Sequence, residues 1–339
     1  MLGGKPVPEQ LVAHIRRDGV NDHPAVRAWR TLHPASSEPE TIMIVNQGKH
    51  FAVYRLGGTV ADGSAVIAKQ RPPADLAVER LVYQDVLPQL PVPRLRCYGY
   101  LEEDDRGIGW LFIEDAGRED YAPLVGQHGT VAGHWLGLVH TAAACVAAPA
   151  WLPQHESDYY RARLGAAHDM MLRTLPSPAL QTDDRAILRT AADQCAYLES
   201  RWDQVVDVCS CVPRTLVHGD LATKNVRLRR SRTGTGLVAF DWEMAGWGIP
   251  AIDLAQDTLH SVSPDLCAYW LAVRHSWPHL ELEDIRRLAD LGGVFRRLMV
   301  LSWARTYYHE AQWAVPGLKE LRQYYIELTH AIEALKRWT

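Results

Sequence analysis

Short apolar runs rich in β-branched residues begin at Thr41 and alternate with turn residues. Up to residue 114 this pattern predicts three strands, one helix and two further strands, because β-branched runs favour strands and three-and-four spacing favours helices. The strands are expected at Thr41–Val45, Phe51–Leu56, Ala65–Gln70, Arg96–Leu101 and Gly109–Glu114. The helix is expected over Ala74–Leu87 and ends at Pro88, because proline cannot continue a helix.

Beyond Gly117 the pattern is mainly helical. Helices are expected over Val131–Ala147, Asp158–Leu175 and Asp183–Val206. Short strands are expected at Val226–Leu228 and Leu237–Phe240. Ser263 followed by Pro264 predicts the N-terminus of another helix. The last helix carries a core-facing stripe made of Leu318, Leu321, Tyr325, Leu328, Ile332 and Leu335.

The order of these elements predicts an α+β fold. Residues 1–40 are polar and rich in proline, and we interpret them as a partly helical extension. Residues 41–116 are expected to form a small β-rich lobe, and residues 117–339 a large, mainly helical lobe.

Composition excludes several classes of partner. The net charge of −4 gives no basic surface for nucleic acid or for a membrane. Residues 121–155 contain no Lys, Arg, Asp or Glu, but Ala, Gly, His128, His134 and His140 make this stretch a buried helix in our interpretation. Six scattered cysteines without a C-x-x-C pair predict reduced thiols. With no apolar run behind the first residues, we expect a cytoplasmic protein.

Candidate chemistry lies in two runs, each an apolar strand that ends in an acid. The first is His218-Gly219-Asp220, with Asn225 five residues after the aspartate, and the second is Asp241-Trp242-Glu243. Asp220, Asn225 and Asp241 are all oxygen donors, a set that suits Mg²⁺ rather than zinc or copper.

These runs resemble the motifs of the aminoglycoside phosphotransferase and choline kinase family, which has a two-lobed fold like that of protein kinases. The resemblance extends over residues 41 to 310. Its landmarks occur in the family's order: Val66-Ile67-Ala68-Lys69, Glu79, Leu138-Val139-His140, His218-Gly219-Asp220 with Asn225, Asp241-Trp242-Glu243, and Gly248 to Ala255. Ile249 departs from the usual Asp of the last motif.

The resemblance implies a role for each landmark. Asp220 would be the catalytic base, and Asn225 and Asp241 would hold Mg²⁺. Lys69, paired with Glu79, would bind the phosphates of ATP, with GTP also possible. The backbone of Glu114 and Ala116 would face the adenine. The loop Asn46–His50 would lie where the family covers the phosphates, although it lacks the glycine-rich pattern. His218 and Asp253 would support the catalytic loop.

Three functions stay open on the residues alone. The first is an O-phosphotransferase acting on a small hydroxylated acceptor, and the second is a nucleotide-binding pseudokinase that serves as a scaffold. The third, a protein kinase, is disfavoured because eleven residues between Asp241 and Asp253 leave no room for an activation segment. No P-loop, H-E-x-x-H or G-x-S-x-G pattern is present.

The acceptor is predicted to be neutral or mildly charged, since the chain from Glu243 on, with 12 acidic residues against 10 Lys or Arg, has no strong acidic bias for a polycation. A sugar, a nucleoside, an amino alcohol or an antibiotic would fit, so a role in antibiotic resistance is one possibility. The segment Gln154–Cys211 is predicted to form one wall of the acceptor site. Lys224 is either a cation for the transferring phosphoryl group or a solvated lysine. Trp242, Trp247, Trp303 and Trp313 line either the core or the cleft. The sequence gives no oligomeric state.

Overall fold

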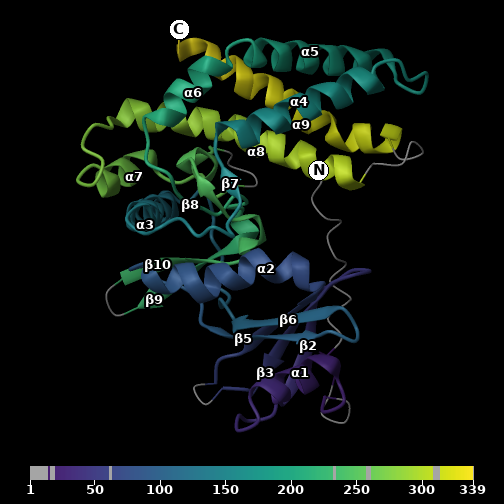
Figure 1. Cartoon of the computed structure of the whole chain (residues 1–339), viewed down its shortest axis with the longest axis vertical. Helices are drawn as coiled ribbons and strands as arrows, with labels where there is room; N and C mark the ends of the chain where they lie inside the picture. The colour runs from purple at the N-terminus through teal and green to yellow at the C-terminus, as the bar shows by residue number, and fades with distance from the viewer. Residues whose placement is uncertain are drawn as a thin grey trace. The chain divides into compact units, whose positions relative to one another are not determined.

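The computed structural model describes residues 14–15, 20–60, 63–231, 234–256, 261–307 and 314–338. The chain divides into two compact units (Figure 1). Gly4–Asp120 and Asn225–Met244 make the first, which we call the sheet unit. Tyr121–Lys224 and Ala245–Thr339 belong to the second, the helical unit. The predicted α+β fold class is confirmed.

An antiparallel sheet of six strands, in the order β1-β2-β3-β4-β6-β5, forms the centre of the sheet unit. Its strands are β1 (His14–Ile15), β2 (Thr41–Gln47), β3 (Ala52–Gly57), β4 (Val66–Arg71), β5 (Cys97–Glu103) and β6 (Ile108–Glu114). Burial alternates along β3, where Ala52, Tyr54 and Leu56 are buried and the residues between them are half-buried, as the period of two demands. All five predicted strands are present, and the N-terminal extension adds β1.

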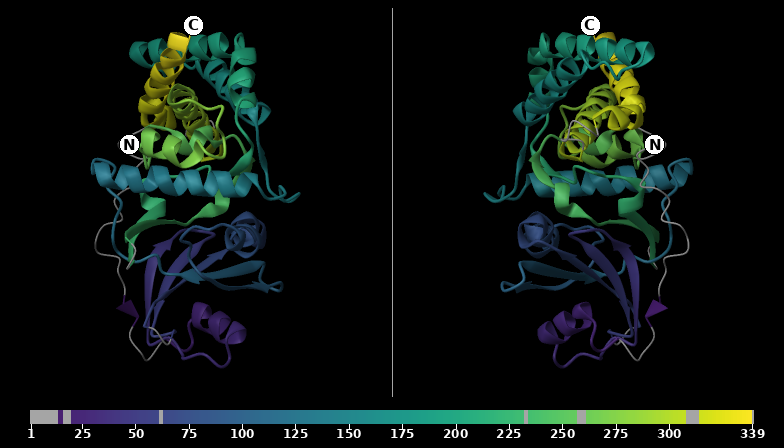
Figure 2. Two further views of the ribbon diagram at one scale, coloured as in Figure 1. Left: turned by 90° about the vertical axis from the view of Figure 1, so that its left-hand side faces the viewer. Right: turned by 90° about the vertical axis from the view of Figure 1, so that its right-hand side faces the viewer.

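One helix packs on each face of this sheet (Figure 2). The first, α1 (Pro24–Leu32), comes from the extension, which was predicted to be partly helical, and it buries Val26 and Trp29 against Trp110 and Phe112. The second, α2 (Pro73–Leu81), covers the opposite face. It continues into a π-helical segment, Val82–Val86, and a 3₁₀ turn, Leu87–Gln89. Pro88 lacks the N–H of a regular helical bond, so the predicted helix ends irregularly.

A later hairpin completes the sheet unit. Its strands, β9 (Val226–Ser231) and β10 (Gly234–Ala239), are longer than predicted. The segment after β6 holds the hairpin: the Leu228 N–H donates to the Glu119 carbonyl oxygen at 2.9 Å, and Arg229 pairs with Glu114 at 3.0 Å. Residues separated by more than a hundred positions are thereby joined.

The helical unit packs helices around a small three-stranded sheet. The sheet has the order β7 (Gln154–His155), β11 (Gly246–Gly248), β8 (Thr215–Val217). The helices are α3 (Gly126–Ala144), α4 (Ser157–Thr174), α5 (Thr182–Glu199), α6 (Trp202–Ser210), α7 (Leu266–Val273), α8 (Leu282–Tyr307) and α9 (Ala314–Leu335). In the part of the chain that the structure describes, no helix has the length and apolar character needed to cross a membrane.

Two helix predictions in this unit were wrong in detail. The single helix expected over Asp183–Val206 is broken between α5 and α6, where Arg201 leaves the helical region with φ −122° and ψ 24°. The cap expected at Ser263 is supplied by Asp265, whose carboxylate accepts from the Ala268 N–H at 2.9 Å. Ser263 itself takes a left-handed backbone with φ 47°, which is not the extended conformation of an N-cap.

The stripe predicted for the last helix is confirmed where its side chains are described. Its members Leu321, Tyr325, Leu328, Ile332 and Leu335 are buried. The side chain of Leu318 lies outside the described residues.

Glycines let α3 approach α7 closely. A Cβ added at Gly133 would collide with the carbonyl oxygen of Asp265, and one added at Gly137 would collide with the side chain of Ala272. The predicted burial of this uncharged helix is confirmed, since Trp135, Leu136 and Val139 are all buried. Its small residues serve close backbone packing.

We predict that Gly133→Ala lowers the free energy of unfolding by about 2 kcal/mol, because backbone atoms of α7 cannot yield to the added methyl group. Gly165→Ala, at an open position of α4, is the matched control and should raise it by about 0.5 kcal/mol through lower entropy of the unfolded chain. Urea unfolding measures both. Equal changes in the free energy of unfolding for the two substitutions would contradict the close contact between α3 and α7.

A buried histidine lies on β7 of the small sheet. His155 is 2% exposed, and its ring stacks on Tyr159 with centroids 4.0 Å apart. Burial, followed by the charge of Arg163, lowers the pKa of His155 from 6.5 to about 4. The folded protein therefore holds this ring neutral under conditions in which the unfolded chain binds a proton.

Stability should consequently fall as the pH drops from about 6.5 towards 4. At about pH 5, the low pKa of His155 lowers the free energy of unfolding by about 2 kcal/mol. We predict that His155→Phe, which keeps the ring but cannot titrate, loses about 2 kcal/mol less than the wild type between about pH 7.5 and pH 5. Urea unfolding at the two pH values measures this difference, and equal losses in both proteins would contradict it.

Candidate active site

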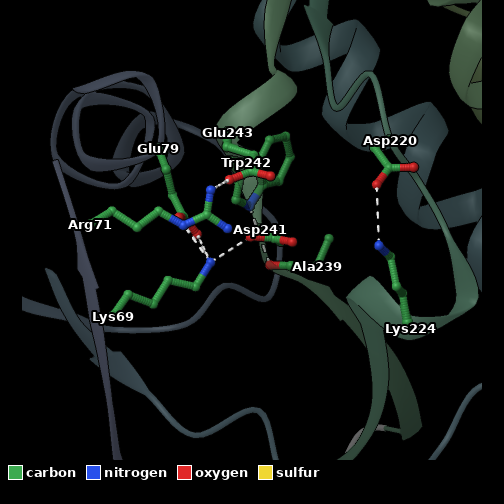
Figure 3. A network of polar contacts seen from close by, with 9 residues as sticks. All are labelled: Lys69, Arg71, Glu79, Asp220, Lys224, Ala239, Asp241, Trp242 and Glu243. Carbon is green, nitrogen blue, oxygen red and sulfur yellow. Dashed lines mark hydrogen bonds and ion pairs between the residues drawn. The ribbon is translucent and has the colours of Figure 1, made fainter. Parts of the chain in front are cut away.

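A buried lysine joins three segments of the sheet unit (Figure 3). Lys69 lies on β4, on the face that α2 covers. Its Nζ donates to Glu79 of α2, at 2.7 Å to Oε1 and 2.9 Å to Oε2. It also donates to Oδ1 of Asp241, just after β10, at 2.6 Å. One ammonium group therefore connects the central strand, the covering helix and the later hairpin.

Burial makes this contact strong. Lys69 is 6% exposed and Glu79 is 1% exposed. Desolvation alone would lower the pKa of Lys69, but the carboxylates of Glu79 and Asp241 outweigh it and raise that pKa. The lysine is therefore held charged.

A second ion pair lies beside the first (Figure 3). Arg71, two residues after Lys69, contacts Glu243, two residues after Asp241. Burial, followed by the charge of Asp241, raises the pKa of Glu243 to about 7. The two pairs attach the segment after β10 to β4 at two successive positions on the same side of the strand.

The hairpin brings the two candidate metal ligands to one end. Val226 pairs with Ala239 in the ladder, and the Phe240 N–H donates to the carbonyl oxygen of Asn225 at 3.0 Å. Asn225 and Asp241 therefore flank the same end of the hairpin. Asp241 has φ 68°, an unusual conformation for a residue with a side chain. Such residues cluster at functional sites.

These two residues fit Mg²⁺ by the chemistry of their donors, an amide and a carboxylate oxygen. Among the described residues, no group of three or more His, Cys, Asp and Glu is arranged to hold a metal ion. A cation bound by Asn225 and Asp241 would fill the rest of its shell with water and phosphate oxygens, as Mg²⁺ does in nucleotide sites.

Glu114 ends β6, where the chain leaves the sheet. Its N–H donates to the carbonyl oxygen of Arg96 at 2.8 Å, and its side chain accepts from the Arg96 N–H at 2.9 Å. The next N–H, of Asp115, donates to the carbonyl oxygen of Ala65 at 3.0 Å. The residues directly before β5 and β4 therefore fix the path of the chain up to Asp115.

Asp220 belongs to the helical unit. Its Oδ1 lies 3.4 Å from an Arg296 nitrogen of α8, and its Oδ2 lies 3.8 Å from the Nζ of Lys224. The side chains of Asp220 and Arg296 are 14% and 11% exposed, whereas that of Lys224 is 72% exposed. The mostly buried carboxylate of Asp220 therefore has two cations beside it, a mostly buried one from Arg296 and an exposed one from Lys224.

A second aspartate holds the loop that carries Asp220. The carboxylate of Asp253 accepts from the N–H of His218 at 2.7 Å and from that of Gly219 at 3.1 Å. His140 Nε2 lies 3.5 Å from the same group. Burial would raise the pKa of Asp253, but His140 and His218 lower it. The predicted supporting role of Asp253 is confirmed, and Gly219, with φ 77°, supplies the left-handed turn.

The structure brings Lys69, Glu79 and Asp241 into one network, with Asn225 at the same hairpin end, and places Asp220 in the other unit. Sequence reasoning missed the pairing of Arg71 with Glu243, because no local pattern joins residues so distant in sequence. Trp242 and Trp247 are core residues, 1% and 3% exposed. The side chains of Trp303 and Trp313 lie outside the described residues.

An antiparallel sheet that carries a buried lysine–glutamate pair, followed by a helical unit with an aspartate-supported loop, is characteristic of kinase-like phosphotransferases. The chain belongs to the phosphotransferase enzyme family, whose model matches residues 41–296. It is therefore a small-molecule phosphotransferase of a nucleotide-dependent family. The predicted family resemblance is confirmed. A comparison with curated protein sequences found no significant match.

Solved structures share the fold at low identity. The GDP and kanamycin complex of APH(2")-IIia is 14% identical with a TM-score of 0.59, covering 88% of this chain and 97% of that one. A putative aminoglycoside phosphotransferase from Ralstonia eutropha is 14% identical (TM-score 0.55, coverage 91% and 98%). Choline kinase from Cryptosporidium parvum is 11% identical (TM-score 0.55, coverage 93% and 96%).

We predict that Lys69→Met lowers the free energy of unfolding by about 3 kcal/mol, because it leaves two neighbouring carboxylates buried without their cation. The double variant Lys69→Met with Glu79→Gln should recover at least half of this loss, since it removes one of the stranded charges. Urea unfolding of the single and double variants measures the coupling. A double variant less stable than Lys69→Met would contradict the charge-pair account.

Proposed function

We propose that this protein is an ATP-dependent O-phosphotransferase that moves the γ-phosphoryl group to a hydroxyl of a small molecule, with Asp220 as the catalytic base. The network of Lys69, Glu79 and Asp241 is the observation that carries this proposal. A buried cation held by two carboxylates, one of them beside Asn225, matches what a nucleotide phosphate and its magnesium ion require.

Each residue has a role in this reaction. Lys69 would bind the phosphates while Glu79 holds its ammonium group in place. Asn225 and Asp241 would hold Mg²⁺, which neutralises charge on the phosphate oxygens. The carbonyl of Glu114 and the N–H of Ala116 would bind the adenine. Asp220 would accept the proton of the acceptor hydroxyl as its oxygen bonds to phosphorus and the bond to the β-phosphate oxygen breaks.

The surroundings of Asp220 support a neutral or mildly charged acceptor. Arg296 and Lys224 both approach its carboxylate, and two cations disfavour an ammonium group beside the reacting hydroxyl. The wall proposed for Gln154–Cys211 has a candidate in α4, because Tyr160 stacks on Phe295 with ring centroids 3.7 Å apart. Phe295 directly precedes Arg296. A sugar, a nucleoside, an amino alcohol or an antibiotic remains within this class.

We predict that Asp220→Asn abolishes acceptor-dependent phosphoryl transfer, with a loss in kcat of at least about 10²-fold, because an amide cannot accept the hydroxyl proton. The assay is ATP consumption with mass detection of phosphorylated products over a panel of hydroxylated molecules. Lys224→Met is the matched variant beside the same carboxylate. If its exposed cation is only solvated, kcat stays within a fewfold of wild type.

Two outcomes would contradict this function. Undiminished turnover by Asp220→Asn would remove Asp220 as the base. Tight binding of ATP without phosphorylation of any panel member would favour the scaffold alternative, a pseudokinase.

We also predict that the wild type phosphorylates neutral or anionic acceptors in preference to polycationic aminoglycosides. The cations beside Asp220 repel an acceptor ammonium group, and salt should weaken that repulsion. Comparing kcat/KM for matched acceptors at low and high salt measures the effect. Efficient turnover of a kanamycin-like polycation that declines steeply with salt would reverse this assignment.

A further inference from the structure

An ion pair in the sheet unit joins β3 to the segment that follows β6. The Nε of Arg55 donates to Oδ2 of Asp115 at 2.5 Å. The other oxygen, Oδ1, accepts from the N–H of Gly117 at 3.1 Å. The side chain of Arg55 is 32% exposed and that of Asp115 is 16% exposed. Both oxygens of Asp115 are therefore engaged, one by a cation and one by the backbone.

Strand register places Arg55 on the face of the sheet that carries Lys69. Arg55 pairs with Ile67 across β3 and β4, and Val53 pairs with Lys69. Because side chains alternate between faces, Arg55, Val53, Ile67 and Lys69 share one face. Asp115 lies between Glu114 and Ala116, the two residues proposed to bind the adenine. The ion pair therefore connects β3 to the segment that is proposed to bind the adenine.

The hydrogen-bond donors and acceptors of the segment 114–116 can distinguish adenine from guanine. Adenine presents the N6 amino group, a donor, at the position where guanine presents O6, an acceptor. A carbonyl from Glu114 and an N–H from Ala116 complement adenine, whereas guanine would need an acceptor for its own N–H groups. The carboxylate of Asp115 is a charged acceptor within this segment that could serve the N–H groups of guanine, and Arg55 occupies its Oδ2.

We infer that the Arg55–Asp115 ion pair determines the purine specificity of the site. This inference rests on the proposed function, because it requires a nucleotide bound at Glu114 and Ala116. Arg55 lies on the face of the sheet that carries Lys69, where its planar guanidinium could stack on a bound purine. It also keeps Asp115 from accepting the N–H groups of guanine. Arg55 thereby favours ATP over GTP as phosphoryl donor.

Titration calorimetry with ADP and with GDP, each with Mg²⁺, tests this directly without any acceptor. We expect the wild type to bind ADP more tightly than GDP. Arg55→Met should weaken ADP binding about fivefold and narrow the ratio of the ADP and GDP affinities about tenfold, because it frees the carboxylate of Asp115. Asp115→Asn should weaken ADP binding to a similar degree and leave the ratio at its wild-type value.

The double variant should bind ADP no more weakly than Arg55→Met alone, since both substitutions break one interaction. Arg106→Met is the matched control, because Arg106 pairs with Glu103 at 3.4 Å in the turn between β5 and β6. It should leave both affinities within twofold. Thermal unfolding of each variant checks that it is folded.

The outcomes separate the inference from the function on which it rests. A folded wild type that binds neither diphosphate contradicts the proposed function itself. A wild type that binds ADP while Arg55→Met keeps the same ratio overturns the inference alone. If the losses in ADP affinity caused by Arg55→Met and Asp115→Asn add fully in the double variant, the inference is also overturned.

Discussion

The buried ammonium group of Lys69 is the contact on which the candidate site depends. Transferring this charge from water is costly, and the structure compensates with two carboxylates, from Glu79 and Asp241, within hydrogen-bond distance. These partners come from a covering helix and from a hairpin far along the chain. Because the loss of any one partner leaves a poorly compensated charge in the interior, this contact holds the three segments in one arrangement.

The division of the chain into two units also divides the chemistry. The sheet unit contains the candidate phosphate-binding and metal-binding residues. The helical unit contains Asp220 and also Asp253, whose carboxylate holds the loop that carries Asp220. The boundary runs between Lys224 and Asn225, inside the catalytic loop motif. The loop therefore carries the proposed base in one unit and a proposed metal ligand in the other, within six residues.

The strands could be predicted because β-branched runs are a local pattern. The lysine–glutamate pair could be predicted only because the resemblance of Val66-Ile67-Ala68-Lys69 to a family motif implies it. The cap of α7 could not, because Ser263 and Asp265 are both good caps and only the left-handed backbone of Ser263 decides between them. Ion pairs such as Arg55 with Asp115 left no sequence signal either, since side chains sixty residues apart meet only once the sheet has formed.

We propose that Asp241 and Lys69 form a prepared site for a magnesium nucleotide. The Mg²⁺ dependence of ADP affinity, measured by titration calorimetry for the wild type and Asp241→Asn, tests this claim most directly. We expect Mg²⁺ to strengthen ADP binding to the wild type about tenfold or more and to have little effect on Asp241→Asn, because the variant loses a charged ligand. An equal effect of Mg²⁺ on both proteins, or none on the wild type, would contradict the account.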